Sequence, residues 1–252
     1  MTRLRHTVDG PADAPVVLFS NPIGTAFELW ELQLPALTGR FRVVRYDHRG
    51  QGGSEVTPGP YSVELLADDL ASLLDELGIA RASVCGLSLG GAVGMFFAVA
   101  YADRLDSLVL ACTSAYFGTP ESWHERAALV RRRGIGPLVD PVLQRWFTED
   151  ADVDDVARCR AMLEATPVEG YAACCEGLAD WDFRARLGEI SAPTVVICGA
   201  QDPATPLAHA EVIANGTGAP LVMIEGAAHL ASVEQPGAFD EALLEALTKE
   251  AR

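Results

Sequence analysis

Short apolar runs recur along the chain and alternate with segments of helical spacing. Continuous runs of Val, Leu, Ile and Phe are typical of strands buried on both faces, as in parallel sheets. Alternation of such strands with helices predicts a doubly wound α/β sheet. The strand-like runs are residues 16–20, 43–46, 83–85, 108–112, 194–198 and 221–224.

Between these strands, apolar residues recur every three or four positions, which predicts amphipathic helices. The segments with this spacing include 62–77, 89–101 and 206–214. Gly78 follows the first segment and is well placed to end that helix, because glycine readily adopts the left-handed conformation found at helix ends.

The strand rhythm stops between residues 116 and 190, where several helical patterns follow one another. We interpret residues 116–190 as an inserted helical cap and residues 1–115 and 191–252 as the α/β core. Glycine and proline breaks at 118–120, 134–137 and 166–167 divide the cap into separate helices.

Composition and charge exclude several classes of function. The 252 residues are 49% hydrophobic and 21% charged, as in a globular chain of one domain or one domain with an insertion. With 19 Lys and Arg against 35 Asp and Glu, the formal charge is −16, so nucleic acids and anionic membranes are poor partners. Without an uncharged apolar stretch of about 18 residues or a signal-like start, we expect a cytoplasmic protein.

The six cysteines form no Cys-x-x-Cys pair and no zinc-binding spacing with the five histidines. Several of them end apolar runs, which favours reduced thiols in the core. We therefore expect neither a disulfide nor a metal nor another cofactor.

The segment Gly86-Leu87-Ser88-Leu89-Gly90 has the pattern G-x-S-x-G, between a predicted strand and a predicted helix. The pentapeptide alone is modest evidence, because a chain of this composition would contain it by chance with a probability of roughly one in ten. The strand–turn–helix setting is stronger, since it is that of a nucleophile elbow, in which a serine hydroxyl projects from a tight turn. The Leu89 N–H would then be one oxyanion donor.

A serine nucleophile needs a base, and the base needs an orienting carboxylate. Asp202 follows the run 194–198, and His229 follows the run 221–224. Both should therefore join Ser88 at the carboxyl edge of the sheet, where open α/β sheets bind ligands. We predict a Ser88–His229–Asp202 triad, with Glu225 as the alternative acid. The structural alternative is that Ser88 and Asp202 lie in ordinary turns and His229 in an ordinary loop.

A second oxyanion donor should come from an early loop. Asn21-Pro22-Ile23-Gly24-Thr25 follows the first long strand-like run, and the Ile23 N–H is our candidate. A simple strand-to-helix connection is the alternative.

These residues, together with the segment Tyr46-Asp47-His48-Arg49-Gly50-Gln51-Gly52-Gly53-Ser54, resemble the α/β-hydrolase family over nearly the whole chain. The resemblance implies an eight-stranded, mostly parallel sheet with helices on both faces and a helical cap after the sixth strand. Members of the family hydrolyse esters, lactones, C–C bonds, epoxides and haloalkanes, so the fold does not name a substrate. A serine at the elbow, where epoxide and haloalkane hydrolases carry aspartate, argues against the last two.

Local stretches resemble the 3-oxoadipate enol-lactonases more narrowly, although Gln51 stands where a histidine is frequent. The resemblance implies hydrolysis of the enol-lactone to 3-oxoadipate in the β-ketoadipate pathway of bacterial aromatic degradation. The stretches are Asn21-x-x-Gly24-Thr25, Gly118-Thr119-Pro120-Glu121-x-Trp123, Arg145-Trp146-Phe147-Thr148 and Glu169-Gly170-Tyr171-x-x-Cys174-Cys175-Glu176.

An anionic lactone needs local cations in a chain of charge −16. We expect Arg126, Arg132 and Arg133 in the cap to bind its carboxylate, with a solvated helix face as the alternative. Trp123 and Trp146 are candidates to line the pocket, and packing of cap against sheet is the alternative for both.

In the implied reaction His229 takes the Ser88 proton, Ser88 attacks the lactone carbonyl and water releases the acyl-enzyme. Direct attack by water that His229 activates is the alternative mechanism.

Another serine hydrolase, such as an esterase, a perhydrolase or a C–C bond hydrolase, would share these residues, whereas a binding protein without turnover would not need a triad. The expected partner is a small anionic lactone, and a homo-oligomer is left open.

Overall fold

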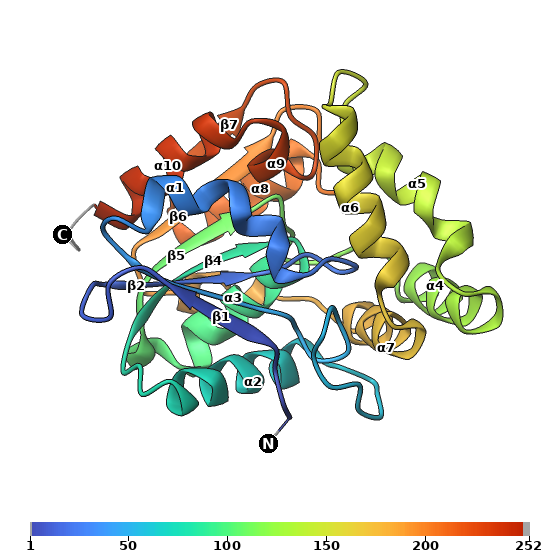
Figure 1. Cartoon of the computed structure of the whole chain (residues 1–252), viewed down its shortest axis with the longest axis horizontal. Helices are drawn as coiled ribbons and strands as arrows, with labels where there is room; N and C mark the ends of the chain where they lie inside the picture. Colours follow the sequence, from blue (N-terminus) through green and yellow to red (C-terminus); the bar gives the residue numbers. More distant parts are fainter. Residues whose placement is uncertain (1, 249–252) are drawn as a thin grey trace.

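A mixed sheet of seven strands forms the centre of the molecule in the computed structural model, which describes residues 2–248 (Figure 1). The strand order is β1-β3-β2-β4-β5-β6-β7, with β1 antiparallel to β3 and all other neighbours parallel. The strands are β1 (His6–Asp9), β2 (Val16–Ser20), β3 (Arg42–Tyr46), β4 (Ala82–Leu87), β5 (Leu105–Ala111), β6 (Thr194–Gly199) and β7 (Leu221–Ile224).

Six of these strands are the ones that the apolar runs predict. The central strands β2, β4 and β5 are buried along almost their whole length, which agrees with burial on both faces. The sequence did not indicate β1, because this four-residue edge strand is only partly buried and carries little apolar signal.

The expectation of eight strands is wrong for the described residues, which form seven. The chain before β1 follows the loop after β3 instead of adding a strand. There the Asp47 N–H donates to the Arg5 carbonyl oxygen at 2.9 Å, and the Glu55 N–H donates to the Arg3 carbonyl oxygen at 3.0 Å.

Helices cover both faces of the sheet (Figure 1). On one face α3 (Leu89–Ala100) packs on β2, β4 and β5 with α2 (Val63–Glu76) beside it, and on the other α10 (Pro236–Thr248) packs on β5, β6 and β7. The Ser62 hydroxyl caps α2 by accepting a hydrogen bond from the Leu65 N–H at 3.2 Å, and Gly78 follows that helix with a φ of +64°. Besides the four helices described next, the remaining helices are η1 (Phe27–Gln33), α1 (Leu34–Leu37), η2 (Ala102–Arg104), η3 (Arg184–Glu189), α8 (Leu207–Thr217) and α9 (Ala231–Glu234).

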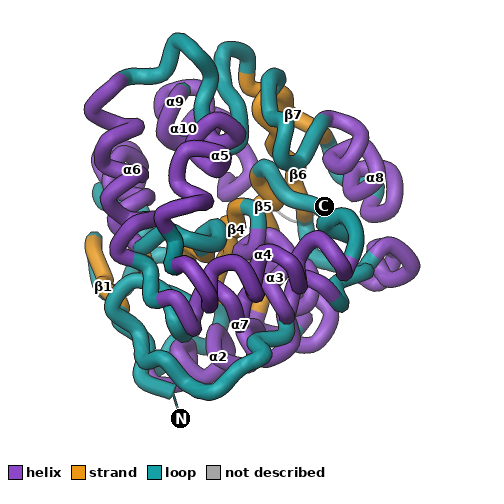
Figure 2. The backbone as a smooth tube through the Cα atoms, turned by 90° about the vertical axis from the view of Figure 1, so that its right-hand side faces the viewer, coloured by secondary structure: helices purple, strands orange, loops and turns teal. Residues whose placement is uncertain are grey.

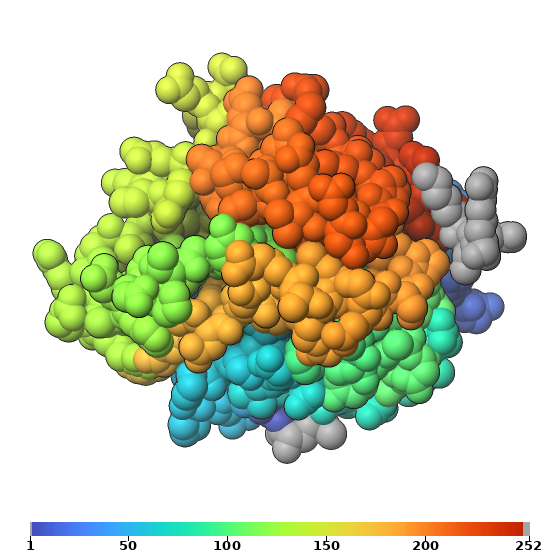
Figure 3. All heavy atoms as spheres, turned by 180° about the vertical axis from the view of Figure 1, so that it is seen from behind, coloured from blue at the N-terminus to red at the C-terminus, as the bar shows by residue number. Residues whose placement is uncertain are grey.

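Four helices follow β5 and lie together at one end of the molecule, and we call them the cap helices. Figure 2 faces them, and Figure 3 shows part of them from behind as the yellow-green end. The predicted breaks at 118–120, 134–137 and 166–167 fall at the ends of these helices. The domain boundaries at 115/116 and 190/191 stay predictions. The cap helices are α4 (Pro120–Arg133), α5 (Gly136–Trp146), α6 (Val153–Ala165) and α7 (Val168–Ala179).

The thiols belong to the interior. All six cysteines are buried and free, including Cys85, Cys112 and Cys198, which end apolar runs. Burial raises the pKa of the Cys198 thiol to about 11, which disfavours its reactive thiolate form. Among residues 2–248, none of the helices is long and apolar enough to cross a bilayer.

Candidate active site

Ser88 lies on a tight turn between β4 and α3. Its φ of 56° and ψ of −115° are unusual for a residue other than glycine. The flanking glycines permit this turn, because a Cβ atom at Gly86 would lie 2.1 Å from the Gly90 carbonyl oxygen, and one at Gly90 would lie 2.0 Å from the Ser20 carbonyl oxygen. The G-x-S-x-G segment therefore has the backbone of a nucleophile elbow.

The His229 imidazole and the Asp202 carboxylate form a buried pair. His229 Nδ1 lies 2.8 Å from Asp202 Oδ2, and because a carboxylate only accepts hydrogen bonds, Nδ1 is the protonated nitrogen. Burial on its own would raise the pKa of Asp202, but His229 and the Thr205 donors lower it to about 2. An ionised Asp202 thus fixes the imidazole and leaves Nε2 free to accept a proton.

Thr205 completes the surroundings of this pair, although no sequence motif pointed to it. Its hydroxyl donates to Asp202 Oδ2 at 2.7 Å and lies 3.4 Å from His229 Nδ1, while its N–H donates to Asp202 Oδ1 at 3.0 Å. Glu225, the alternative acid, is exposed and makes no hydrogen bond with His229. The structure therefore places Asp202, and not Glu225, beside the histidine.

The two expected oxyanion donors are the backbone N–H groups of Leu89, which directly follows Ser88, and of Ile23, in the loop after β2. Leu89 is the first residue of α3, so its N–H has no acceptor within the helix and lies where the helix dipole favours negative charge. Ile23 lines the same cavity as Ser88, and its N–H donates to no group of the described chain. Both N–H groups are therefore available to an oxyanion.

Side chains of the core anchor the loop that carries Ile23. The Asn21 amide nitrogen donates to the Tyr46 carbonyl oxygen at 2.9 Å, and the Asn21 amide oxygen accepts from Trp30 Nε1 at 2.7 Å. The Gln51 side chain, which departs from the family pattern, accepts from the Gly24 N–H at 2.8 Å. Buried polar contacts thus hold this loop in one position.

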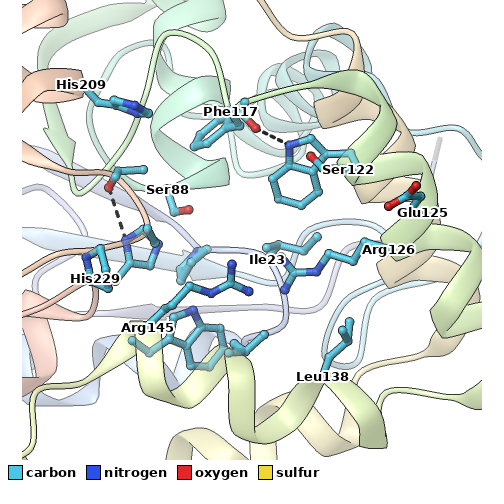
Figure 4. Close-up of a pocket in the computed structure, with 18 of the residues that line it drawn as sticks. Ile23, Ser88, Phe117, Ser122, Glu125, Arg126, Leu138, Arg145, His209 and His229 are labelled. Carbon is cyan, nitrogen blue, oxygen red and sulfur yellow. Dashed lines mark hydrogen bonds between the residues drawn. The ribbon is translucent and has the colours of Figure 1, made fainter.

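Ser88 and His229 line a cavity of about 510 Å³ between the core and the cap helices (Figure 4). Trp123 and Trp146 line it as well, at the place expected for them. The Ser88 hydroxyl and the His229 imidazole are not hydrogen-bonded to each other, and in hydrolases this bond often tightens only when substrate binds. Much of the remaining wall is apolar and includes Phe117, Leu129, Leu138 and Val142.

Two arginines extend into this cavity from opposite sides in Figure 4. Arg126 comes from α4, donates to the Tyr171 hydroxyl and lies over the rings of Trp123 and Tyr171, at 5.2 and 5.3 Å from their centroids. Arg145 comes from α5 and forms no hydrogen bond or ion pair with the described residues. Partial burial and then the Arg126 charge lower the pKa of Arg145.

Arg132 and Arg133 are exposed and lie outside the cavity, which corrects the expectation that they bind substrate. They follow Arg126 by six and seven residues, so they lie about 9 to 10.5 Å further along the helix axis. Arg145, which was not expected there, lines the cavity instead. The available signal was its position beside Trp146 in a lactonase-like stretch.

Two other titratable residues of the cavity wall carry no sequence motif. His209 stacks on Tyr116 with ring centroids 5.4 Å apart, and burial lowers its pKa. Glu125 is exposed and is not ion-paired with either cavity arginine. Within residues 2–248 no group of three or more His, Cys, Asp or Glu side chains is arranged to hold a metal ion.

Comparison with known proteins gives matches along most of the chain. A family model described as alpha/beta hydrolase fold matches residues 15–236. The chain is 37% identical to 3-oxoadipate enol-lactonase 2 of Acinetobacter baylyi, covering 95% of this chain and 91% of that protein. It is 39% identical to the solved enol-lactonase of Burkholderia xenovorans, with a TM-score of 0.95 and coverage of 98% and 97%. A malate-bound thermophilic esterase from Thermogutta terrifontis is 32% identical, with a TM-score of 0.93 and coverage of 98% and 93%.

Proposed function

The chain belongs to the α/β hydrolase fold family and is a hydrolase, and from this premise we propose that it hydrolyses the enol-lactone of 3-oxoadipate at Ser88. The relatives named as enol-lactonases in A. baylyi and B. xenovorans support this substrate. The proposed role is a step of the β-ketoadipate pathway in bacterial aromatic catabolism.

The observation that carries the proposal is Arg126, an arginine without a carboxylate partner in the cavity of Ser88 and His229. Its Nε atom is buried and unpartnered. In a chain with 35 acidic and 19 basic residues, leaving such a cation without an acidic partner is costly unless a bound anion compensates for it. We therefore expect Arg126 to bind the carboxylate of an anionic substrate.

Acylation follows from the proposed triad. His229 Nε2 takes the proton of the Ser88 hydroxyl as the oxygen attacks the lactone carbonyl, and the ionised Asp202 stabilises the imidazolium. The Leu89 and Ile23 N–H groups stabilise the negative oxygen. When the ring C–O bond breaks, the enolate leaves, and the proton held by His229 returns to it as it becomes a ketone.

Deacylation uses one water molecule. His229 takes a proton from the water, the hydroxide attacks the acyl-enzyme, and the proton returns to the Ser88 oxygen. The new carboxylic acid ionises at neutral pH, so one water is consumed and one proton is released. A monoanionic lactone thereby becomes an open-chain dianion.

The test of this proposal compares an anionic lactone with a neutral ester. Arg126→Gln should raise KM for the enol-lactone about tenfold or more, because a charge-assisted hydrogen bond contributes about 1.5 to 3 kcal/mol. The same variant should change KM for a neutral acetate ester less than about threefold. Arg133→Gln removes the same charge outside the cavity and should affect neither substrate. Equal effects of Arg126→Gln on both substrates would contradict the proposed carboxylate contact.

A neutral-ester hydrolase is the second candidate function. The apolar cavity wall and the similarity to the T. terrifontis esterase favour it. This candidate predicts a higher kcat/KM for the neutral ester than for the enol-lactone, with no loss on removal of the Arg126 charge.

A further inference from the structure

We propose that this cavity is a two-carboxylate site that binds open-chain dicarboxylates more tightly than monocarboxylates of the same length, and that the hydrolysed product therefore inhibits the enzyme. The inhibition rests on the function proposed above, whereas the binding preference depends only on the cavity. The residue that the inference adds is Arg145.

The site contains two cations. Arg126 enters the cavity from α4, where the Tyr171 hydroxyl and the flanking rings hold its guanidinium. Arg145 enters from α5, on the opposite side in Figure 4, which is the side of His229. The two side chains point toward each other in Figure 4, and both charges act on the Tyr171 hydroxyl, so the pair forms one region of double positive charge.

The cavity arginines differ from several other arginines of the cap helices in having no acidic partner. Neither Arg126 nor Arg145 forms an ion pair with the described residues, and the carboxylate on the cavity wall, Glu125, is paired with neither. Among the described residues, the paired cap arginines are Arg131 with Glu169 and Glu176, Arg158 with Asp155, and Arg160 with Asp140 and Glu164.

The two cations also repel each other. The charge of Arg126 contributes, after partial burial, to the lowered pKa of Arg145. One bound carboxylate offsets one positive charge and leaves the other without a counterion. A ligand with two carboxylates offsets both, so we expect the second carboxylate to add affinity.

Ring opening places the second negative charge on the side where Arg145 lies. The lactone has one carboxylate, which we assign to Arg126. Cleavage of the acyl–oxygen bond and hydrolysis of the acyl-enzyme produce a second carboxylate at Ser88, and Ser88 and His229 line the same cavity as Arg145. The dianionic product consequently offers one carboxylate to each guanidinium. The substrate has a single carboxylate, so it can neutralise only one of them.

Titration calorimetry of the wild-type protein with adipate and with hexanoate tests the inference. These probes have the same number of carbons and differ by one carboxylate. We expect the Kd of adipate to be at least about tenfold lower than that of hexanoate, the contribution of one charge-assisted contact. Adipate should also inhibit hydrolysis of a neutral ester competitively.

Arg145→Gln should raise the Kd of adipate about tenfold and change that of hexanoate less than about threefold, because Arg126 still holds one carboxylate. Arg145→Lys keeps the charge and should keep most of the adipate preference. The exposed Arg133→Gln is the matched control and should change neither Kd, and thermal melting establishes that each variant is folded.

Equal affinities of the wild type for the two probes would overturn the inference. Absence of binding of both probes would also overturn it. So would an equal loss of affinity for both probes in Arg145→Gln, which would mean that both arginines hold a single carboxylate. The binding assay requires no turnover, so a protein that fails to hydrolyse the enol-lactone can still bind adipate through Arg145, and the two proposals fail separately.

Discussion

Four donors surround the buried carboxylate of Asp202: His229 Nδ1, the Thr205 hydroxyl and the N–H groups of Ala204 and Thr205. They fix the carboxylate and keep it ionised, so that it holds His229 with Nε2 directed to accept a proton. This arrangement explains how an aspartate in an ordinary-looking turn can serve as the acid of a triad.

Asp202→Asn should lower kcat by about 10³- to 10⁴-fold, because an amide can hold His229 in the wrong tautomer. Steady-state kinetics of the folded variant with the enol-lactone check this expectation. Glu225→Gln is the matched control and should stay within about twofold of wild type. Near-normal activity of Asp202→Asn together with a severe loss of activity in Glu225→Gln would mean that Glu225, and not Asp202, is the acid of the triad.

The sequence predicts the candidate triad better than it predicts the substrate contacts. Ser88, Asp202 and His229 each follow a strand in the expected order, so their meeting depends only on sheet topology. Arg145 could not be assigned in this way, because its place in the cavity depends on how the cap helices pack over the core. Arg133, on the same helix as Arg126, shows that a cap cation near the right position can still lie outside the site.

At the scale of elements, the site depends on close approach between the elbow and its neighbours. Gly90 in the first turn of α3 lies directly against the end of β2, where a Cβ atom would be 2.0 Å from the Ser20 carbonyl oxygen. That oxygen belongs to the backbone and has little room to move. Any side chain at Gly90 must therefore displace the helix or the strand.

Gly90→Ala should destabilise the protein by about 3 kcal/mol or more, since overpacking against backbone forces the elements apart. Gly136→Ala is the control, because a Cβ atom at this first residue of α5 meets nothing within 4 Å and alanine favours the helix. Urea denaturation compares the two variants. Equal midpoints would show that the elbow tolerates a side chain at Gly90.

The apolar runs and the glycine and proline breaks specify most elements, since each is a local property of the chain. The edge strand β1 escaped detection because its partner is β3, more than 30 residues away, and its own four residues lack an apolar pattern. Family resemblance also overstated the sheet by one strand. The contacts among the cap helices depend on long-range packing that no local pattern specifies.

At the scale of the whole molecule, buried titratable groups link stability to pH. His48 lies under the loop of Ile23, where its Nε2 is 3.1 Å from the Asn21 carbonyl oxygen. Burial lowers the pKa of His48 to about 4, although the contact with Asn21 opposes this shift. The unfolded chain would bind a proton at this histidine near pH 6.5, so protonation favours unfolding between about pH 6.5 and 4.

Because of His48 alone, the free energy of unfolding should therefore fall by about 3 kcal/mol as the pH decreases from about 6.5 to 4. Thermal melting of wild type and His48→Gln across this range checks the expectation, and the variant should lose less stability on acidification. The exposed His124→Gln should keep the wild-type dependence. A drop in His48→Gln as large as that of wild type would assign the acid sensitivity to other groups.

Hydrolysis of the enol-lactone at Ser88 is tested most directly by the decay of enol-lactone ultraviolet absorbance with purified wild type and Ser88→Ala side by side, without added metal or cofactor. We expect rapid decay with wild type and a kcat lower by several orders of magnitude in Ser88→Ala, whose melting temperature should stay close to that of wild type. No decay above background with folded wild type, or equal decay with both proteins, would contradict hydrolysis of this lactone at Ser88.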